Sequence, residues 1–419
     1  MSVDANSPDT RLRGNVGADV VLAARGAAPR ETSDAMSFRQ ALNIDDLERL
    51  ARKRLPAGVY GFIAGGTQDN RTRDNNRAAL DRIRFKPRGL VDVSQRSQGV
   101  TIFGHRFDSP FGIAPMGIAG IACFEADIAM ARAAARMNVP FTLSNMSTLP
   151  MEKVARSCDS VKWLQVYMPG DRERAAHIVK RASGAGYQAL LVTIDVPVGA
   201  NRENNLRSGF TLPLHLNPKI MLDGLLHPRW LAGVFARTLM ATGIPRLENS
   251  AMFDRPSMLA SANPTIRASG DRVDWSFMRW LRDQWHKPLL IKGVMHPADA
   301  REAVACGLDG IVVSNHGGRQ LDGAAAPVEV LPQIIAAANR KLTILADSGF
   351  RRGGDILKAF ALGANFVLCG RAALFGAAAG GEEGVLHALT ILKTEVHRDL
   401  GLMGCTTMSD LSPASITPP

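Results

Sequence analysis

Short apolar runs recur along the chain from residue 110 onward, and most of them lead into a segment with helical periodicity. The runs are rich in β-branched residues and end in polar residues or glycine, which is typical of buried strands. Helical segments follow over Ala126–Met137 and Arg172–Ala185. The pattern predicts eight strands, at Phe111–Pro115, Phe141–Ser144, Trp163–Tyr167, Ala189–Asp195, Leu289–Lys292, Gly310–Ser314, Leu342–Asp347 and Phe366–Cys369.

Eight strands that alternate with helices predict an α/β fold, a closed (β/α)₈ barrel of the TIM type, with a doubly wound open sheet as the alternative. In a barrel the functional side chains gather at the carboxyl ends of the strands. Polar residues do fall at the predicted strand ends: Gln165, Tyr167, Thr193, Asp195, Lys292, Ser314, His316 and Asp347.

The predicted barrel occupies residues 37–405, between a leader (1–36) without a sustained period and a C-terminal tail (406–419). We interpret the leader as flexible. An insertion at 200–279, after the fourth strand, replaces an ordinary loop of ~2–6 residues. It carries ten Lys or Arg, six Asp or Glu and the apolar run Trp230–Ala236. The insertion is therefore either a membrane-surface anchor or a lid on the barrel mouth.

Composition and charge narrow the class of partner. With 46% hydrophobic and 21% charged residues, the chain has a globular composition. Fifty Lys and Arg against 39 Asp and Glu give a net charge of +11, which favours a carboxylate, a phosphate, an acidic membrane or nucleic acid. No nucleic-acid partner is expected, because only three Tyr and five Trp are present and no basic patch is interleaved with aromatic residues.

Cysteine usage and the length of the apolar runs bear on location. The five cysteines lack metal-ligand spacing and predict neither a disulfide framework nor a metal site, which fits a reducing cytoplasm. No apolar run approaches the ~20 residues that cross a bilayer. We expect a cytoplasmic protein, attached peripherally to the inner face of the cell membrane if the insertion is an anchor.

The segment Ser314–Asp322 carries the most informative chemistry, because it follows a strand and places an imidazole three residues before a guanidinium. Oxidation of a 2-hydroxy acid needs a base poised near neutral pH and a bidentate ligand for the carboxylate. We assign these roles to His316 and Arg319. Asp195 is placed to orient His316, and Arg202 follows seven residues later; their structural alternatives are a helix cap and a solvated loop charge.

Two segments that combine glycine and arginine follow the seventh and eighth strands, at Asp347–Gly354 and Cys369–Arg371. Barrels commonly bind phosphate at this position, through backbone N–H groups and a helix N-terminus. Either segment alone would more simply be a tight turn. The two together predict a phosphorylated ligand.

Taken together, these motifs make the chain resemble the FMN-dependent 2-hydroxy acid dehydrogenase and oxidase family, from about residue 37 to Cys405. The run Ser-Asn-His-Gly-Gly-Arg-Gln at 314–320 is the most specific match. The resemblance implies FMN as cofactor, His316 as base paired with Asp195, and Tyr167 as hydrogen-bond partner of the substrate hydroxyl. It implies Arg202 and Arg319 as carboxylate ligands. The implied flavin ligands are Ser144, Gln165, Thr193, Lys292 and Asp347, with Gly349, Arg351, Gly370 and Arg371 around the phosphate.

Three positions depart from the family pattern. Phe62 stands where members usually have a tyrosine that helps to hold the carboxylate, Gly117 where oxidases typically have alanine, and Met146 where tryptophan is frequent. Gly117 favours a dehydrogenase, and the His-Pro-Arg-Trp segment ending at Trp230 resembles the membrane-associated lactate and mandelate dehydrogenases. Phe62 indicates weaker carboxylate binding or an unusual substrate.

We therefore expect an enzyme that oxidises an L-2-hydroxy acid similar to lactate or mandelate, passes electrons from FMN to a quinone-like acceptor, and forms a homo-oligomer. Two other enzymatic readings stay open: an oxidase or monooxygenase that uses O₂, and an enzyme whose substrate lacks a simple carboxylate. The non-enzymatic alternative is a barrel that binds a phosphorylated ligand without redox chemistry.

Overall fold

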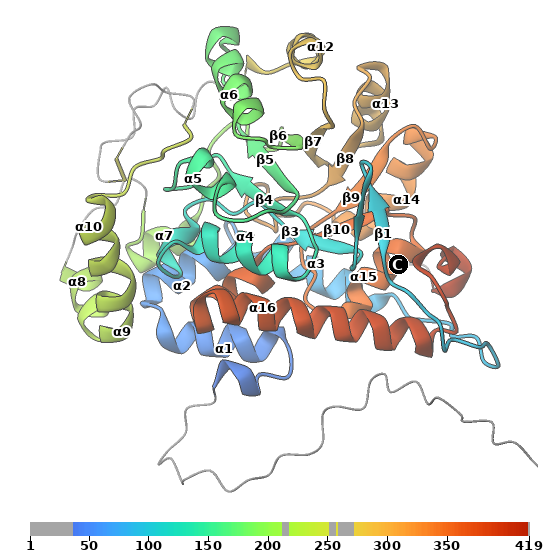
Figure 1. The fold of residues 1–419 in the computed structure, drawn as a ribbon, viewed down its shortest axis with the longest axis horizontal. Coiled ribbons are helices and arrows are strands. Elements are labelled where there is room, and N and C mark those ends of the chain that lie inside the picture. The colour runs from blue at the N-terminus through green and yellow to red at the C-terminus, as the bar shows by residue number, and fades with distance from the viewer. Residues whose placement is uncertain (1–36, 212–217, 251–256, 259–271, 418–419) are drawn as a thin grey trace, which may run out of the picture. The chain divides into compact units, whose positions relative to one another are not determined.

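The computed structural model describes residues 37–211, 218–250, 257–258 and 272–417, so the predicted leader lies outside the described residues. Eight parallel strands close into a barrel, in which the last strand pairs with the first (Figure 1). They are β3 (Phe111–Ile113), β4 (Phe141–Ser144), β5 (Lys162–Val166), β6 (Ala189–Thr193), β7 (Leu289–Val294), β8 (Gly310–Val313), β9 (Thr343–Ala346) and β10 (Phe366–Cys369). The predicted barrel is confirmed, and the open sheet is excluded.

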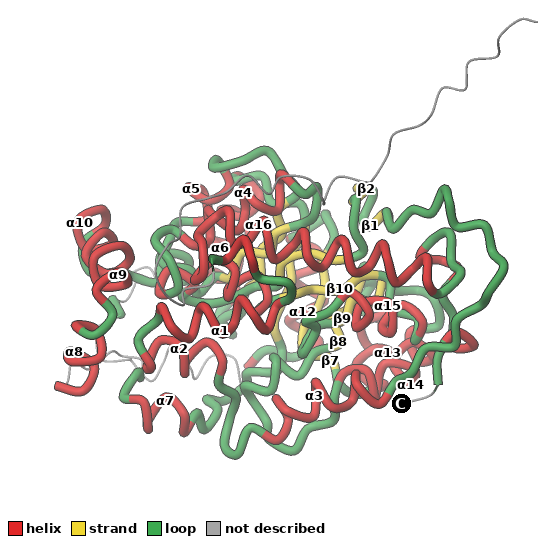
Figure 2. Tube along the Cα trace, turned by 90° about the horizontal axis from the view of Figure 1, so that it is seen from below, coloured by secondary structure: helices red, strands yellow, loops and turns green. Residues whose placement is uncertain are grey.

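Helices form the outer layer around the strands (Figure 2). Three precede the barrel, α1 (Ile44–Arg54), α2 (Ala57–Ala64) and α3 (Arg71–Arg82), and α1 packs along the long C-terminal helix α16. The barrel helices are α4 (Ala126–Arg136), α5 (Met151–Ala155), α6 (Arg172–Gly184), α12 (Trp275–Gln284), α13 (Pro297–Ala305), α14 (Pro327–Ala338), α15 (Gly353–Ala361) and α16 (Arg371–Leu402).

Local capping explains where several of these helices begin. The Asp171 carboxylate accepts from the Arg174 N–H at 2.9 Å and starts α6, and the Asp274 carboxylate accepts from the Phe277 N–H at 2.8 Å and starts α12. The sequence analysis placed residues 275–279 in the insertion. Because α12 begins at Trp275, they belong instead to a barrel helix.

The insertion contains α7 (Glu203–Ser208), α8 (Pro218–Leu225), α9 (Pro228–Trp230), the π-helical segment η3 (Leu231–Ala236) and α10 (Arg237–Thr242). In both views α8 to α10 stand to one side of the barrel (Figures 1 and 2). The Trp230 indole anchors them, since it donates to the Ile121 carbonyl at 2.8 Å. Among the described residues, no helix combines the length and the hydropathy that crossing a membrane requires.

A two-stranded hairpin that the sequence analysis missed, β1 (Val100–Ile102) and β2 (His105–Phe107), fills the amino-terminal end of the barrel. Ile102 and Phe107 are buried in the barrel core. The Phe107 ring lies 6.4 Å from that of Trp163 and 5.9 Å from that of Phe366, residues at the starts of β5 and β10. The C-terminal segment also packs on this body, through the bridge between Phe85 and Ile416.

Candidate active site

The carboxyl ends of the barrel strands surround a cavity of about 650 Å³, a volume within the ~300–1,000 Å³ usual for ligand sites. Every residue that the sequence analysis assigned to the site lines this cavity except Asp195, which lies behind His316. The lining residues of this set are Ser144, Gln165, Tyr167, Thr193, Arg202, Lys292, His316, Arg319, Asp347, Gly349, Arg351, Gly370 and Arg371.

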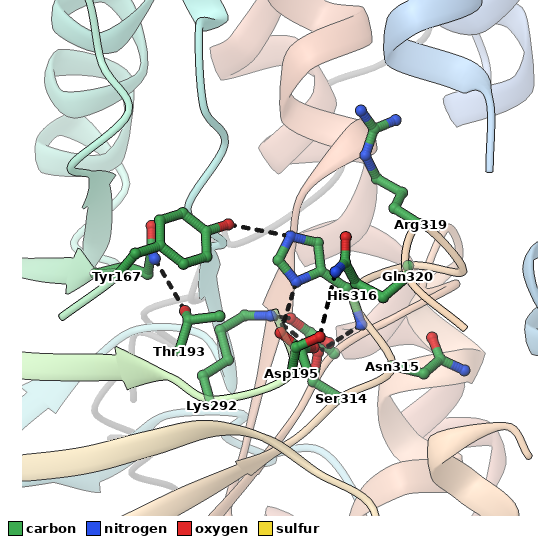
Figure 3. A network of polar contacts seen from close by, with 12 residues as sticks. Tyr167, Thr193, Asp195, Lys292, Ser314, Asn315, His316, Arg319 and Gln320 are labelled. Atoms are coloured by element: carbon green, nitrogen blue, oxygen red, sulfur yellow. Dashed lines mark hydrogen bonds and ion pairs between the residues drawn. The ribbon is translucent and has the colours of Figure 1, made fainter. Parts of the chain in front are cut away.

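His316 stands in a turn where three successive residues have left-handed backbone angles. Its φ is 59°, and those of the two following glycines are 66° and 73°. Glycine is required in the third place, because a Cβ on Gly318 would come within 2.4 Å of the Arg73 backbone nitrogen. The turn directs the imidazole between two partners (Figure 3). Nδ1 lies 2.9 Å from Asp195 Oδ1, and Nε2 lies 3.3 Å from the Tyr167 hydroxyl.

Burial and neighbouring charges set the ionisation of these three groups. Burial lowers the pKa of His316 below its ordinary value of 6.5, against the opposing influence of Asp195. Burial alone would raise the pKa of Asp195, but His316 and Lys292 outweigh it and lower that pKa. Burial, with Asp195 close by, raises the pKa of Tyr167 to about 12. Near pH 7 the site therefore holds a neutral imidazole, a carboxylate and a neutral phenol.

One wall of the cavity is a hydrogen-bonded row across β4, β5 and β6. Ser144 Oγ donates to Gln165 Oε1 at 2.7 Å, and Gln165 Nε2 donates to Thr193 Oγ1 at 2.9 Å. The row forms because Ser144 and Gln165 are register partners in neighbouring parallel strands. These three polar side chains present donors and acceptors to a ligand in fixed positions.

Lys292 forms a fixed cation near the end of β7. Its buried ammonium lies 2.9 Å from Asp347 Oδ2 and donates to Ser314 Oγ at 2.9 Å. Burial alone would lower the pKa of Lys292, but the carboxylates of Asp347 and Asp195 outweigh it and raise that pKa. The lysine is therefore charged throughout the physiological range of pH.

The four arginines of the predicted site share the cavity, but each also binds protein atoms that the sequence did not indicate. Arg319 and Arg371 donate to carbonyl oxygens at the C-terminal end of α2, at 2.6–3.0 Å, where helical carbonyls lack partners of their own. Arg202 donates to the Gln320 amide oxygen at 2.9 Å, and Arg351 pairs with carboxylates of α1. Figure 3 shows Arg319 directed away from the imidazole.

These half-buried guanidinium groups lie close enough to repel one another. Burial, together with Arg202 and Arg371, lowers the pKa of Arg319 well below its ordinary value. Burial, together with Arg351 and Arg73, lowers the pKa of Arg371 to about 10. Anions relieve this repulsion when they bind, so the cavity is suited to a ligand carboxylate or phosphate.

A family model described as FMN-dependent dehydrogenase matches residues 51–418 of the sequence. The chain belongs to the FMN-dependent dehydrogenase family. The resemblance drawn from the motifs is thereby confirmed, and so are FMN as the cofactor and oxidoreduction as the class of reaction.

Individual relatives support the same assignment. (S)-Mandelate dehydrogenase from Pseudomonas putida is 42% identical over 371 residues, which cover 88% of this chain and 92% of that protein. A peroxisomal (S)-2-hydroxyacid oxidase from Arabidopsis thaliana is 37% identical over 373 residues, 89% of this chain and 95% of that protein. The crystal structure of the monotopic membrane protein (S)-mandelate dehydrogenase matches with a TM-score of 0.85 and 42% identity, over 90% of this chain and all of that one.

The residues present fit FMN, the cofactor of this family. At one end, Gly370 precedes the first turn of α16, whose free N–H groups attract a phosphate, and the repelling cations Arg351 and Arg371 line the same region. At the other end, the row on β4 to β6 and the charged Lys292 offer polar partners for a flavin ring.

The sequence analysis did not assign two residues that lie beside the site, Gly293 and Ser348. Gly293 interrupts the pairing of β7 with β8 at a φ of 107°, and a Cβ there would lie 2.6 Å from Asp195 Cβ. A glycine inside a strand pattern is a signal for such a bulge or close approach. Ser348 lies in the Asp347–Gly354 segment already singled out, but its φ of 78° has no signature in a serine.

Proposed function

We propose that this enzyme oxidises an L-2-hydroxy acid, lactate-like or mandelate-like, to the corresponding 2-oxo acid, with His316 as the catalytic base. The observation that carries the proposal is the neutral imidazole of His316, held between Asp195 and Tyr167 in a cavity that the guanidinium groups of Arg202 and Arg319 also line. A base, a neutral hydrogen-bond donor and a cationic carboxylate site are the three parts that the reaction needs.

The roles of the side chains follow from their chemistry. Arg202 and Arg319 bind the substrate carboxylate, which relieves their mutual repulsion. Tyr167 hydrogen-bonds the substrate hydroxyl as a neutral phenol. His316 takes up, at Nε2, a proton from the substrate hydroxyl or from the carbon that bears it. The Asp195 carboxylate at Nδ1 stabilises the imidazolium that forms. Bound FMN supplies the acceptor for the two electrons that leave the substrate carbon.

We further propose that the insertion attaches the enzyme to a membrane surface, where a quinone-like acceptor is within reach. Large apolar side chains on and after α8 and on α10 are exposed, among them Met221, Leu222, Leu225, Leu226 and Met240. Lys219, Arg229 and Arg237 stand in the same segment, and a cationic, apolar surface suits an anionic lipid headgroup region. The related (S)-mandelate dehydrogenase is described as a monotopic membrane protein.

Anaerobic mixing with a panel of hydroxy acids tests the reaction. The purified protein should be yellow, with about one FMN per chain, and L-lactate or L-mandelate should bleach the flavin. FAD, or no flavin, would contradict the cofactor; bleaching only by molecules that lack a carboxylate would favour the atypical-substrate alternative. Stoichiometric oxygen uptake during turnover would favour an oxidase over the dehydrogenase.

Replacement of the base gives the sharper test. His316→Gln should retain FMN but slow flavin reduction by ~10²–10⁴-fold, whereas His177→Gln, on the exposed face of α6, should not. Because the pKa of His316 is lowered, the wild-type rate should hold at the ordinary histidine value of 6.5 and fall only at lower pH, where the imidazole becomes protonated. A normal rate for His316→Gln would remove this residue from the mechanism.

A further inference from the structure

Ser348 adopts a backbone conformation that serine rarely takes. Its φ is 78°, and it directly follows Asp347 in the connection between β9 and α15. Left-handed angles in residues other than glycine persist only where the surroundings determine them.

The Ser348 hydroxyl joins the turn that carries His316 to the loop after β9. Its oxygen accepts from the backbone N–H of Gly317 at 2.9 Å and, at 3.4 Å, from that of Asn315. Its proton is donated to Asp347 Oδ1 at 2.9 Å. One hydroxyl thus contacts the residues on both sides of His316 and the carboxylate that holds Lys292.

A second path connects the same groups and closes a ring of interactions. Asp347 Oδ2 pairs with Lys292 Nζ at 2.9 Å, and Lys292 donates to Ser314 Oγ at 2.9 Å. Ser314 Oγ in turn accepts from the His316 N–H at 3.1 Å (Figure 3). Two sets of hydrogen bonds, through Ser348 and through Ser314, therefore fix the backbone around His316 relative to the Lys292–Asp347 ion pair.

We propose that Ser348 is a positioning residue, which holds the His316 turn in register with the Lys292–Asp347 pair. The proposal rests on the proposed function, in that it takes His316 as the base. Glycine would adopt this φ without strain but would leave the N–H of Gly317 without its acceptor. The hydroxyl, which accepts and donates at once, explains why a strained serine is compatible with this loop.

The test compares Ser348→Gly with Ser348→Ala, because both lose the hydroxyl and only glycine tolerates the backbone angle. Both variants should bind FMN, and amide hydrogen exchange in 314–318 should accelerate in both. Flavin reduction should slow ~10-fold or more in both. The apparent pKa of the rate profile should fall, because an imidazole less well held against Asp195 gives up its proton more readily. Asn339→Gly, at an exposed left-handed residue after α14 (φ 48°), is the matched control.

The possible results distinguish a failure of this proposal from a failure of the proposal that His316 is the base. Wild-type exchange and rate in Ser348→Gly, with a defect only in Ser348→Ala, would mean that backbone angle and not the hydroxyl matters, and would overturn the proposal. Faster exchange without a change in rate or apparent pKa would also overturn it. A normal rate in His316→Gln would instead overturn the proposed base, whatever the exchange of 314–318.

Discussion

Phe62 lies directly beneath a guanidinium group of the active site. The Arg319 Cζ atom stands 5.0 Å from the centre of its ring, and the Phe210 ring packs against it at 5.3 Å. The side chain is 8% exposed and lines the cavity. Tyr60 does not replace the missing phenol, since its hydroxyl donates to Glu48 at 3.1 Å. Phe62 therefore offers an apolar, cation-stabilising face in place of a hydrogen bond.

Phe62→Tyr tests how phenylalanine in place of tyrosine affects substrate preference. If the missing hydroxyl weakens carboxylate binding, the variant should bind L-lactate ~10- to 100-fold more tightly, the equivalent of one charge-assisted bond of ~1.5–3 kcal/mol. If Phe62 instead packs against an apolar substrate group, mandelate or a longer aliphatic hydroxy acid should bind worse, because the hydroxyl would be left unpaired. Stopped-flow flavin reduction gives the apparent Kd for each. No change with any of the three would mean that this hydroxyl does not reach the substrate.

The sequence located the reacting side chains better than the backbone that carries them. His316 and Asp195 are 121 residues apart, yet both were assigned because each follows a strand and barrel strands bring such ends together. The conformations of Gly293 and Ser348 were not predictable in this way. They depend on what lies opposite them in the folded chain, the Asp195 side chain and the His316 turn. A glycine at 293 signals a bulge or a close approach without saying to which residue, and a serine at 348 gives no local signal.

At the level of elements, the bulge between β7 and β8 makes room for the carboxylate that pairs with His316. Pairing shifts between Lys292 and Val294, and the intervening Gly293 faces Asp195. Bulges near active sites commonly re-aim neighbouring side chains. The same glycine therefore lets Asp195 approach His316.

Gly293→Ala should displace Asp195 from His316 and slow flavin reduction by about 10²-fold, the effect of a misplacement of roughly 1 Å. Gly363→Ala is the matched control, since its φ of 105° is nearly the same and its added Cβ would meet the side chain of Ile335, at 2.9 Å from its terminal Cδ1 atom. Equal melting temperatures with unequal rates would support the assignment. Equal rates would show that Asp195 adapts without cost to the reaction.

The bounds of some strands could be predicted from the sequence. β4 and β10 have the predicted bounds, whereas predicted strands that end at Tyr167, Asp195 and Asp347 stop one or two residues earlier. Of these residues, Tyr167 and Asp347 line the cavity, and Asp195 pairs with His316. The β1–β2 hairpin was missed because strands of three residues are too short to show a period of two.

At the scale of the whole molecule, the insertion raises the question of membrane attachment. Deleting residues 222–245 should release the enzyme from membranes and preserve FMN, but it also removes Trp230 and its bond to the barrel. The double variant Leu222→Asp, Leu226→Asp keeps Trp230 and changes only exposed side chains that lie outside the cavity lining. The double variant should shift from vesicles of anionic lipid to the supernatant with an unchanged rate of flavin reduction.

Leu402→Asp is the control for that experiment, since Leu402 is 69% exposed and Leu226 is 70% exposed. It should sediment with vesicles like the wild type. Unchanged partitioning of the double variant, or a loss of flavin reduction, would favour the lid. The sequence could not separate the two roles, because an apolar run predicts burial without saying whether protein or lipid covers it.

The hairpin at the amino-terminal end also bears on how ligands reach the cavity. Because Ile102 and Phe107 fill that end of the barrel, a hydroxy acid, its oxidised product and an electron acceptor must all use the opposite end, where the cavity lies. They cannot occupy that approach together if each must come close to the same cofactor. We therefore expect the product to leave before the acceptor arrives, and a product that leaves slowly to delay the second half of the cycle.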